Sequence, residues 1–114
     1  MMISNKQLVI WSEFLAIYVD NVRIPWRGDH WCHLVADSLD ELHQFAHTLG
    51  LKRAWFQAHA SLPHYDVTVE VRGVALILGA VAADRRTLIS RGRQLKVELA
   101  EKRTAGEPQL RLFE

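Results

Sequence analysis

The sequence predicts a small single domain of the α/β or α+β class, with two or three short strands and at least three helices. The chain has 114 residues, of which 49% are apolar, and this is enough apolar surface for one core of ordinary domain size. Short apolar runs rich in β-forming residues predict strands. One segment with apolar residues at steps of three and four predicts an amphipathic helix. We expect the domain to span residues 14–103, with an N-terminal extension at 1–13 and a tail at 104–114.

Two strands are predicted in the N-terminal third of the chain. The first is Phe14–Val19, a short apolar run that ends just before two turn-forming residues. The segment Asn21–His30 contains a proline and a glycine and is predicted to be a loop. Trp31–Ala36 is the second predicted strand. Further along, Ala54–Gln57 fits either a third short strand or a turn.

The clearest predicted element is a helix from Leu39 to Leu49. Ser38 and Glu41 have the spacing of a capping box, in which the hydroxyl accepts an unpaired backbone N–H and the carboxylate reaches back. Gly50 follows at the position where a helix C-terminus favours glycine. The apolar face consists of Leu39, Leu42, Phe45, Ala46 and Leu49. His43 and His47 share another face, which we expect to be solvated surface.

The second half of the chain contains one ambiguous segment and one further predicted helix. Alternating valines predict a strand over residues 67–72, but the same valines also continue into a helical pattern with Asp66 or Thr68 as its N-cap. Periodicity does not decide between the two. From Asp84 onward, leucines predict an amphipathic helix to about Arg103, and we expect Thr104–Pro108 to break it.

Charge and cysteine content narrow the class of protein. The formal net charge is +1, so the overall charge does not require a nucleic-acid or anionic-membrane partner. The segment from Asp84 to Arg103 contains seven basic residues and three acidic ones. This basic segment suits phosphates, and the alternative is a solvated helix face with ion pairs within the helix. Cys32 is the only cysteine, which excludes an internal disulfide and a cysteine-based structural zinc site.

The N-terminal sequence lacks the layout of a secretory signal. The longest apolar run, Val74–Ala83, is too short to span a bilayer. We therefore expect a cytoplasmic protein without a membrane partner.

Polar residues gather at the ends of the predicted apolar elements. Asp20 ends the first strand, His33 lies in the second, and His64 and Asp66 precede the next element. Imidazole and carboxylate groups are suited to acid–base chemistry or to a divalent metal site. A divalent metal is compatible with this set but is not required by it. The structural alternative makes Asp66 a helix cap, Asp20 a turn residue and His33 a hydrogen-bonded core histidine.

A second group of candidate residues lies in the predicted loop. Arg23 and Arg27 flank Pro25-Trp26. Arginine binds phosphate or carboxylate groups through paired N–H donors, and a tryptophan stacks on a base. The alternative is a loop anchored by Trp26 with both arginines in solvent.

Several short motifs carry a resemblance to a known family: Ile17–Arg27, Trp31–Asp37, Leu39–Leu42, Phe45-Ala46, Trp55–Gln57 and Leu62–Asp66. Together they resemble the domain of unknown function 4031 family, which is found in bacteria and phages, over roughly Ala16 to Arg86. The resemblance implies that Gln57 belongs to the same site as the polar residues above, and that residues 1–13 are an extension. It favours a helix over Thr68–Leu78. It implies no particular reaction.

The leading hypothesis is a site for a phosphate-bearing ligand, such as a nucleotide or a nucleic-acid end, with hydrolysis as a further step. His33 and His64 would act as acid–base or metal-binding groups, and Asp20 and Asp66 would orient them or bind metal. The two loop arginines would hold the phosphate. One alternative is a non-catalytic nucleotide or nucleic-acid binding module. Another is a protein-interaction module that forms a homo-oligomer through an apolar patch. The residues do not decide whether the chain is an enzyme.

Overall fold

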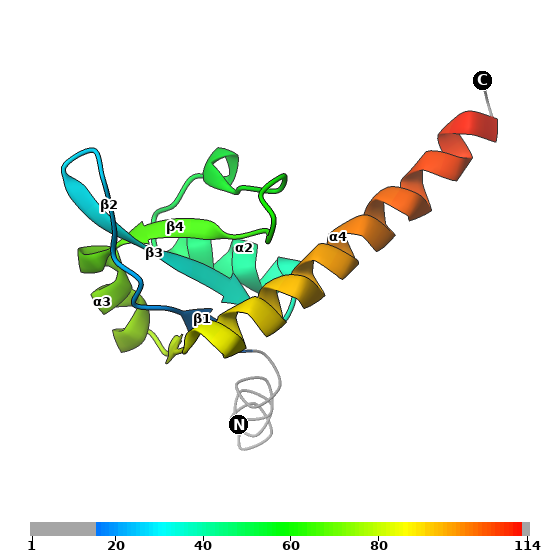
Figure 1. Ribbon diagram of the computed structural model, residues 1–114. Helices are drawn as coiled ribbons and strands as arrows, with labels where there is room; N and C mark the ends of the chain where they lie inside the picture. The colour runs from blue at the N-terminus through cyan, green and yellow to red at the C-terminus, as the bar shows by residue number, and fades with distance from the viewer. Residues whose placement is uncertain (1–15, 113–114) are drawn as a thin grey trace, which may run out of the picture.

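The computed structural model describes residues 16–112, with side chains as far as residue 105. It shows an α+β domain in which helices surround a mixed five-stranded sheet (Figure 1). In chain order the elements are β1 (Ile17–Val19), β2 (Ile24–Trp26), β3 (Asp29–Ala36), α2 (Leu39–Thr48), the 3₁₀ turn η1 (Arg53–Trp55), β4 (Tyr65–Thr68), α3 (Val69–Ile77), β5 (Val81–Ala82) and α4 (Arg85–Leu112). The extension predicted at residues 1–13 lies outside the described part of the chain.

The α+β class fits, but the prediction of two or three strands is wrong because the sheet has five strands within residues 16–112. The segment predicted as a loop, Asn21–His30, contains β2 and the first residues of β3. β2 has three residues and β5 has two, and every one of them is exposed. Strands this short and this exposed carry no alternation of buried and exposed residues, so periodicity does not reveal them.

The eight-residue strand β3 forms the centre of the sheet. Its C-terminal part pairs with β1 and its N-terminal part with β2, both antiparallel. The antiparallel partner β4 lies along the other edge, because Leu34 pairs with both Val19 and Tyr65. β5 pairs with β1 in parallel. β1 and β4 therefore bring residues from distant parts of the sequence next to β3, whereas a two-residue turn joins β2 to it.

One face of the sheet is buried in the core, and the opposite face is only partly covered. Cys32, Leu34, Tyr65 and Val67 project from one face and are buried in the core. Helix α2 packs on this face, where the Nδ1 atom of His43 lies 2.8 Å from the Tyr65 hydroxyl. The opposite face carries the alternate residues of the same strands, because successive side chains of a strand point to opposite sides.

Helix α4 covers part of that opposite face. The guanidinium of Arg91 lies 5.4 Å from the ring centroid of Tyr18, and Leu88 of the same helix is buried near Val35. The helix covers only one end of the face. The other end, which includes His33 and Asp66, stays open.

Helix α2 confirms the predicted helix over Leu39–Leu49, since it spans Leu39–Thr48 with Leu49 as its C-cap. The Ser38 hydroxyl accepts the backbone N–H of Glu41 at 3.2 Å. Gly50 has a φ of 84°, a left-handed conformation that glycine adopts at little cost. His43 is half-buried, so the expectation that it is solvated surface is wrong for this residue.

The ambiguous segment 67–72 contains the end of a strand followed directly by the start of a helix. β4 ends at Thr68, and α3 begins at Val69. The Thr68 hydroxyl accepts the backbone N–H of Val71 at 3.2 Å and caps the helix. The alternating pattern and the helical pattern overlap here because the strand leads directly into the helix.

Helix α4 is longer than predicted. It begins after Asp84, whose Oδ1 accepts the backbone N–H of Thr87 at 2.8 Å, and it continues to Leu112. The predicted end near Arg103 is wrong, because the helix runs through Thr104–Pro108 and away from the sheet (Figure 1). A proline inside a helix lacks one backbone hydrogen bond and crowds the carbonyl four residues earlier, so a helix usually ends before it, but the backbone of α4 continues past Pro108.

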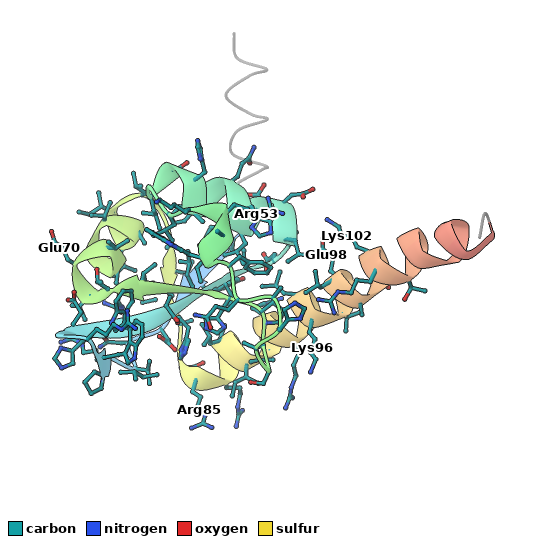
Figure 2. All side chains as sticks on the ribbon, turned by 90° about the horizontal axis from the view of Figure 1, so that it is seen from above. Arg53, Glu70, Arg85, Lys96, Glu98 and Lys102 are labelled. Atoms are coloured by element: carbon teal, nitrogen blue, oxygen red, sulfur yellow. The ribbon has the colours of Figure 1, made fainter. Side chains whose placement is uncertain are left out.

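The middle of α4 is joined to α2 by polar contacts. Glu98 accepts the backbone N–H of Leu39 at 2.9 Å, and Lys102 lies 3.4 Å from Glu98 and 3.6 Å from Asp40. Figure 2 shows Glu98 and Lys102 side by side on the helix. Within residues 16–112, the helices are too short or too polar to cross a bilayer.

Candidate functional site

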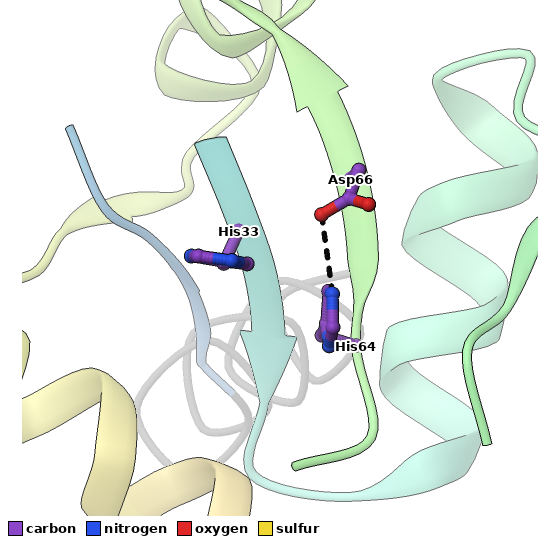
Figure 3. A group of neighbouring side chains, drawn as sticks. All are labelled: His33, His64 and Asp66. Carbon is purple, nitrogen blue, oxygen red and sulfur yellow. Dashed lines mark ion pairs between the residues drawn. The ribbon is translucent and has the colours of Figure 1, made fainter. Parts of the chain in front are cut away.

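Three polar side chains form a row across the open face of the sheet. His33 pairs with Asp66 across β3 and β4. Asp20 follows β1 and lies beside His33, because Val19 pairs with Leu34. Residues opposite each other in neighbouring strands project from the same face. His64 precedes Asp66 by two residues and therefore shares this face as well (Figure 3).

Asp20 binds His33 through both carboxylate oxygens. Oδ2 lies 2.7 Å from His33 Nδ1, and Oδ1 accepts the backbone N–H of His33 at 2.8 Å. Burial alone would raise the pKa of Asp20, but the hydrogen bonds from His33 and its charge outweigh burial and hold that pKa below its ordinary value. An ionised carboxylate only accepts hydrogen bonds, so Nδ1 of His33 carries the proton. In the neutral ring, Nε2 is then left with its lone pair.

His64 is held between a carbonyl and a carboxylate. Its Nδ1 lies 2.7 Å from the Leu62 carbonyl, and its Nε2 lies 3.1 Å from Asp66 Oδ1. Burial would lower the pKa of His64, but the bonds to Asp66 and to the Leu62 carbonyl raise it overall. For Asp66, burial would raise the pKa, and the bond and charge of His64 lower it overall. The Gln57 side chain donates to the other oxygen, Oδ2.

The two histidine rings meet edge to face. Their centroids are 4.9 Å apart and the ring planes are inclined at 83°. His33, His64 and Asp66 each place one potential ligand atom so that the three atoms lie within 4.8 Å of one another (Figure 3). The sheet register thus brings together the two histidines and one carboxylate that the sequence predicted for the site.

The histidine pair lies between two hollows. The first, of about 750 Å³, has His33, His64 and Asp66 on its wall together with three tryptophans, Trp26, Trp31 and Trp55. We call it the aromatic hollow. The second, of about 280 Å³, is lined by the same two histidines and by residues that include Asp20, Ser61 and Arg85. We call it the arginine hollow. His33 and His64 line both.

The other sequence-predicted residues divide into two groups. Trp26 and Gln57 line the aromatic hollow. Arg23 and Arg27 are not among the residues that line either hollow. They lie at the two ends of β2 with φ angles of 55° and 50°. The guanidinium of Arg27 stacks 4.5 Å from the ring centroid of Trp26, and Arg23 donates to Asn21.

Several residues around the site were not predicted from the sequence. Trp31 lies two residues before His33 on β3, so strand alternation would have placed it on the same face. Arg85 was counted in the basic segment, but only the packing of α4 brings it near the histidines. Arg72 donates from Nε to the Asp20 carbonyl at 2.7 Å. No sequence signal links those two residues, because they are 52 positions apart.

The site lies within a region that a family model recognises. The model for "Protein of unknown function (DUF4031)" matches residues 17–95. The chain belongs to this family. The match confirms the resemblance and includes every residue that lines the aromatic hollow of this DUF4031 domain. No curated protein and no solved structure matches the chain.

Proposed function

We propose that this DUF4031 domain binds a nucleotide or a nucleic-acid end and hydrolyses a phosphate ester in it. The observation that carries the proposal is that His33 and His64 line both the aromatic and the arginine hollow. A ligand with an aromatic base on one side and a phosphate on the other would place its phosphate ester at the histidines.

The aromatic hollow suits a base. Trp26 and Trp55 are 56% and 53% exposed, and indole rings left open to solvent are stacking platforms for bases. Trp26 meets Trp31 edge to face, with centroids 5.9 Å apart. The Trp31 N–H donates to the Trp26 carbonyl at 2.9 Å, which holds one wall of the hollow in place.

The arginine hollow suits a phosphate. Arg85 lines it and also lines a neighbouring hollow that contains Arg86 and Arg93. Arginines bind phosphate oxygens through paired N–H donors. Figure 2 shows Arg85 at the start of α4. In this proposal Arg85 takes the phosphate-binding role that the sequence analysis gave to Arg23 and Arg27.

Hydrolysis would use one water molecule. The water oxygen attacks phosphorus, the bond from phosphorus to the ester oxygen breaks, and one proton passes from the water to the leaving oxygen. His33 and His64 hold their Nδ1 atoms in hydrogen bonds. The Nε2 atom of His33 therefore remains for proton transfer or for a cation that activates the water, while the Nε2 atom of His64 faces Asp66 Oδ1 at 3.1 Å.

Titration of the protein with adenosine monophosphate and with a 5′-phosphorylated oligonucleotide, followed by tryptophan fluorescence, tests binding. We expect W55A to weaken binding at least about 5-fold, since stacking on an aromatic ring contributes roughly 1–3 kcal/mol per base. R85A should weaken it at least as much, since a hydrogen bond between charged groups contributes about 1.5–3 kcal/mol. The matched control is K96A, because Lys96 is exposed on α4 (Figure 2). Equal affinity in all three variants would overturn the proposed binding mode.

Release of inorganic phosphate or nucleoside from the same ligands tests the reaction. We expect turnover that H64A abolishes and K96A leaves unchanged. Binding without any turnover would overturn the hydrolytic part and identify the domain as a binding module.

A further inference from the structure

We propose that His33, His64 and Asp66 bind one divalent transition-metal ion of the zinc class through two imidazole nitrogens and one carboxylate oxygen. The inference deepens the proposed function and rests on it only for what the bound ion would do. The binding itself is argued from the geometry of the three side chains.

The spacing of the donor atoms is close to that of a metal centre. Zinc lies about 2.0–2.2 Å from nitrogen and oxygen ligands, so two ligands of a tetrahedral ion are roughly 3.4 Å apart. His64 Nε2 and Asp66 Oδ1 are already 3.1 Å apart, and all three donors lie within 4.8 Å. The His33 donor lies at most roughly 1.4 Å beyond that spacing, and a rotation about the side-chain torsions of His33 covers this distance.

Hydrogen-bond accounting leaves a place for a cation between His64 and Asp66. The Leu62 carbonyl can only accept, so His64 Nδ1 carries a hydrogen. In the neutral ring, Nε2 then presents a lone pair to Asp66 Oδ1, a carboxylate oxygen that also only accepts. Two such atoms 3.1 Å apart repel each other unless a proton or a metal ion lies between them. A metal ion that both atoms coordinate removes this repulsion, and the rival is a proton on His64.

A second group holds each of the three metal-binding residues on the side away from the proposed metal position. Asp20 binds Nδ1 of His33, the Leu62 carbonyl binds Nδ1 of His64, and Gln57 donates to Oδ2 of Asp66. Metal-binding histidines generally donate their other N–H to a carboxylate or a backbone carbonyl, which fixes the ring and its tautomer. Both kinds of partner are present here, one on each histidine.

The donor set also indicates the class of metal. Two imidazoles and one carboxylate suit zinc and its transition-metal neighbours, whereas magnesium and calcium prefer oxygen ligands alone. Three protein ligands leave at least one coordination position for water, as in catalytic zinc sites. His33, His64 and Asp66 all line the aromatic hollow, so this position is accessible from the proposed ligand site. A metal-bound water is a stronger nucleophile at neutral pH than free water.

Cobalt(II) titration of the chelator-treated full chain, without any nucleotide, tests the proposal. We expect one cobalt ion per chain with the visible absorption of a low-coordinate site, displacement by zinc, and no competition from magnesium. H33A and D66N should weaken binding more than 10-fold, and D20N should weaken it about 10–100-fold because it supports a ligand. H47A is the matched control, since His47 is exposed on α2.

Circular dichroism and thermal unfolding of the metal-free variants show whether each one is folded. Cobalt affinity of the native chain no higher than that of a folded D66N would overturn the proposal and leave the His64–Asp66 pair as an ordinary ion pair. Because no nucleotide is present, the result is independent of whether the proposed ligand binds.

Discussion

The Nδ1 atom of His33 lies 2.7 Å from Oδ2 of Asp20, and this bond determines which ring nitrogen of His33 remains for chemistry. Asp20 is 7% exposed, so its hydrogen bonds replace most of its contact with water. The backbone N–H of His33 donates to the same carboxylate. One acidic residue at the end of β1 thus fixes both the position and the tautomer of a histidine in the next strand of the sheet.

Replacing Asp20 with asparagine should destabilise the domain at neutral pH. An amide has no charge, and hydrogen bonds to charged groups contribute about 1.5–3 kcal/mol each. We expect the free energy of unfolding in urea to fall by about 1–3 kcal/mol relative to the native chain. D29N is the control, because Asp29 is exposed. A D20N variant as stable as D29N would contradict this account of the Asp20–His33 bond.

His43 should make stability depend on pH. Burial is the main cause that lowers the pKa of His43, and the nearby Arg53 adds to it. Because the folded-state pKa lies below the unfolded value of about 6.5, the folded state binds fewer protons than the unfolded state in the window between the two pKa values. The contribution of His43 is therefore present above about pH 6.5 and is lost as the pH falls through the folded pKa.

Melting temperatures at pH 7.5 and 5.5 check this prediction. The native chain should lose more stability on acidification than H43Q, whose side chain does not titrate but can still meet the Tyr65 hydroxyl. An equal loss in both proteins would show that His43 does not contribute to the pH dependence.

The buried face of α2 should be far more sensitive to truncation than the exposed part of α3. Leu42 is fully buried, whereas Ile77 is 84% exposed. A leucine truncated to alanine in a core costs about 2–5 kcal/mol, because it removes apolar contacts and leaves a cavity. We expect L42A to lower the free energy of unfolding by that amount and I77A to lower it by less than about 0.5 kcal/mol. Comparable losses in chemical denaturation would contradict the packing of α2 against the sheet.

Two helical glycines should respond differently to alanine. A Cβ at Gly73 in α3 would meet nothing within 4 Å, whereas a Cβ at Gly92 in α4 would lie 3.0 Å from Leu62 Cδ1. We expect G73A to stabilise the domain by about 0.5–1 kcal/mol, since alanine favours helix over glycine. G92A should gain less or lose stability, because Leu62 must move and its carbonyl holds His64.

Thermal unfolding of both variants and of the double variant G92A/L62A checks this pair of predictions. The smaller residue at position 62 should restore the gain at position 92. A G92A variant that is as stabilised as G73A would show that Leu62 is free to move.

The sequence predicts the elements that have clear local signals. The helix Leu39–Leu49 follows from its cap and its periodicity, and β1 and β3 follow from apolar runs. β2 and β5 were missed because they are short and exposed, and pairing with longer strands forms them. The sequence predicts that Thr104–Pro108 breaks the last helix, because this segment contains a glycine and a proline, whereas α4 continues to Leu112. Local patterns cannot show pairing between segments that are distant in the sequence.

The candidate site also has one part that the sequence predicts and one part that only the packing of distant segments forms. Because imidazole and carboxylate groups work together in one kind of site, the sequence predicts that His33, His64, Asp20 and Asp66 form one set. The register of β3 with β4 places His33 opposite Asp66. The arginine hollow depends on the packing of α4 against the sheet, which no sequence motif encodes. For this reason the sequence predicts Arg23 and Arg27, whereas Arg85 is the arginine that lines a hollow together with the histidines.

Nitrogen NMR of the imidazole rings, recorded before and after one equivalent of zinc, tests the central claim most directly. The chain has six histidines, and our account predicts that only His33 and His64 change, with the large shift at Nε2 and the proton retained at Nδ1. It also predicts that the signals of His30, His43, His47 and His59 stay in place. Zinc-induced shifts at those four residues instead, or no shift at His33 and His64, would contradict the proposal that they form one metal site with Asp66.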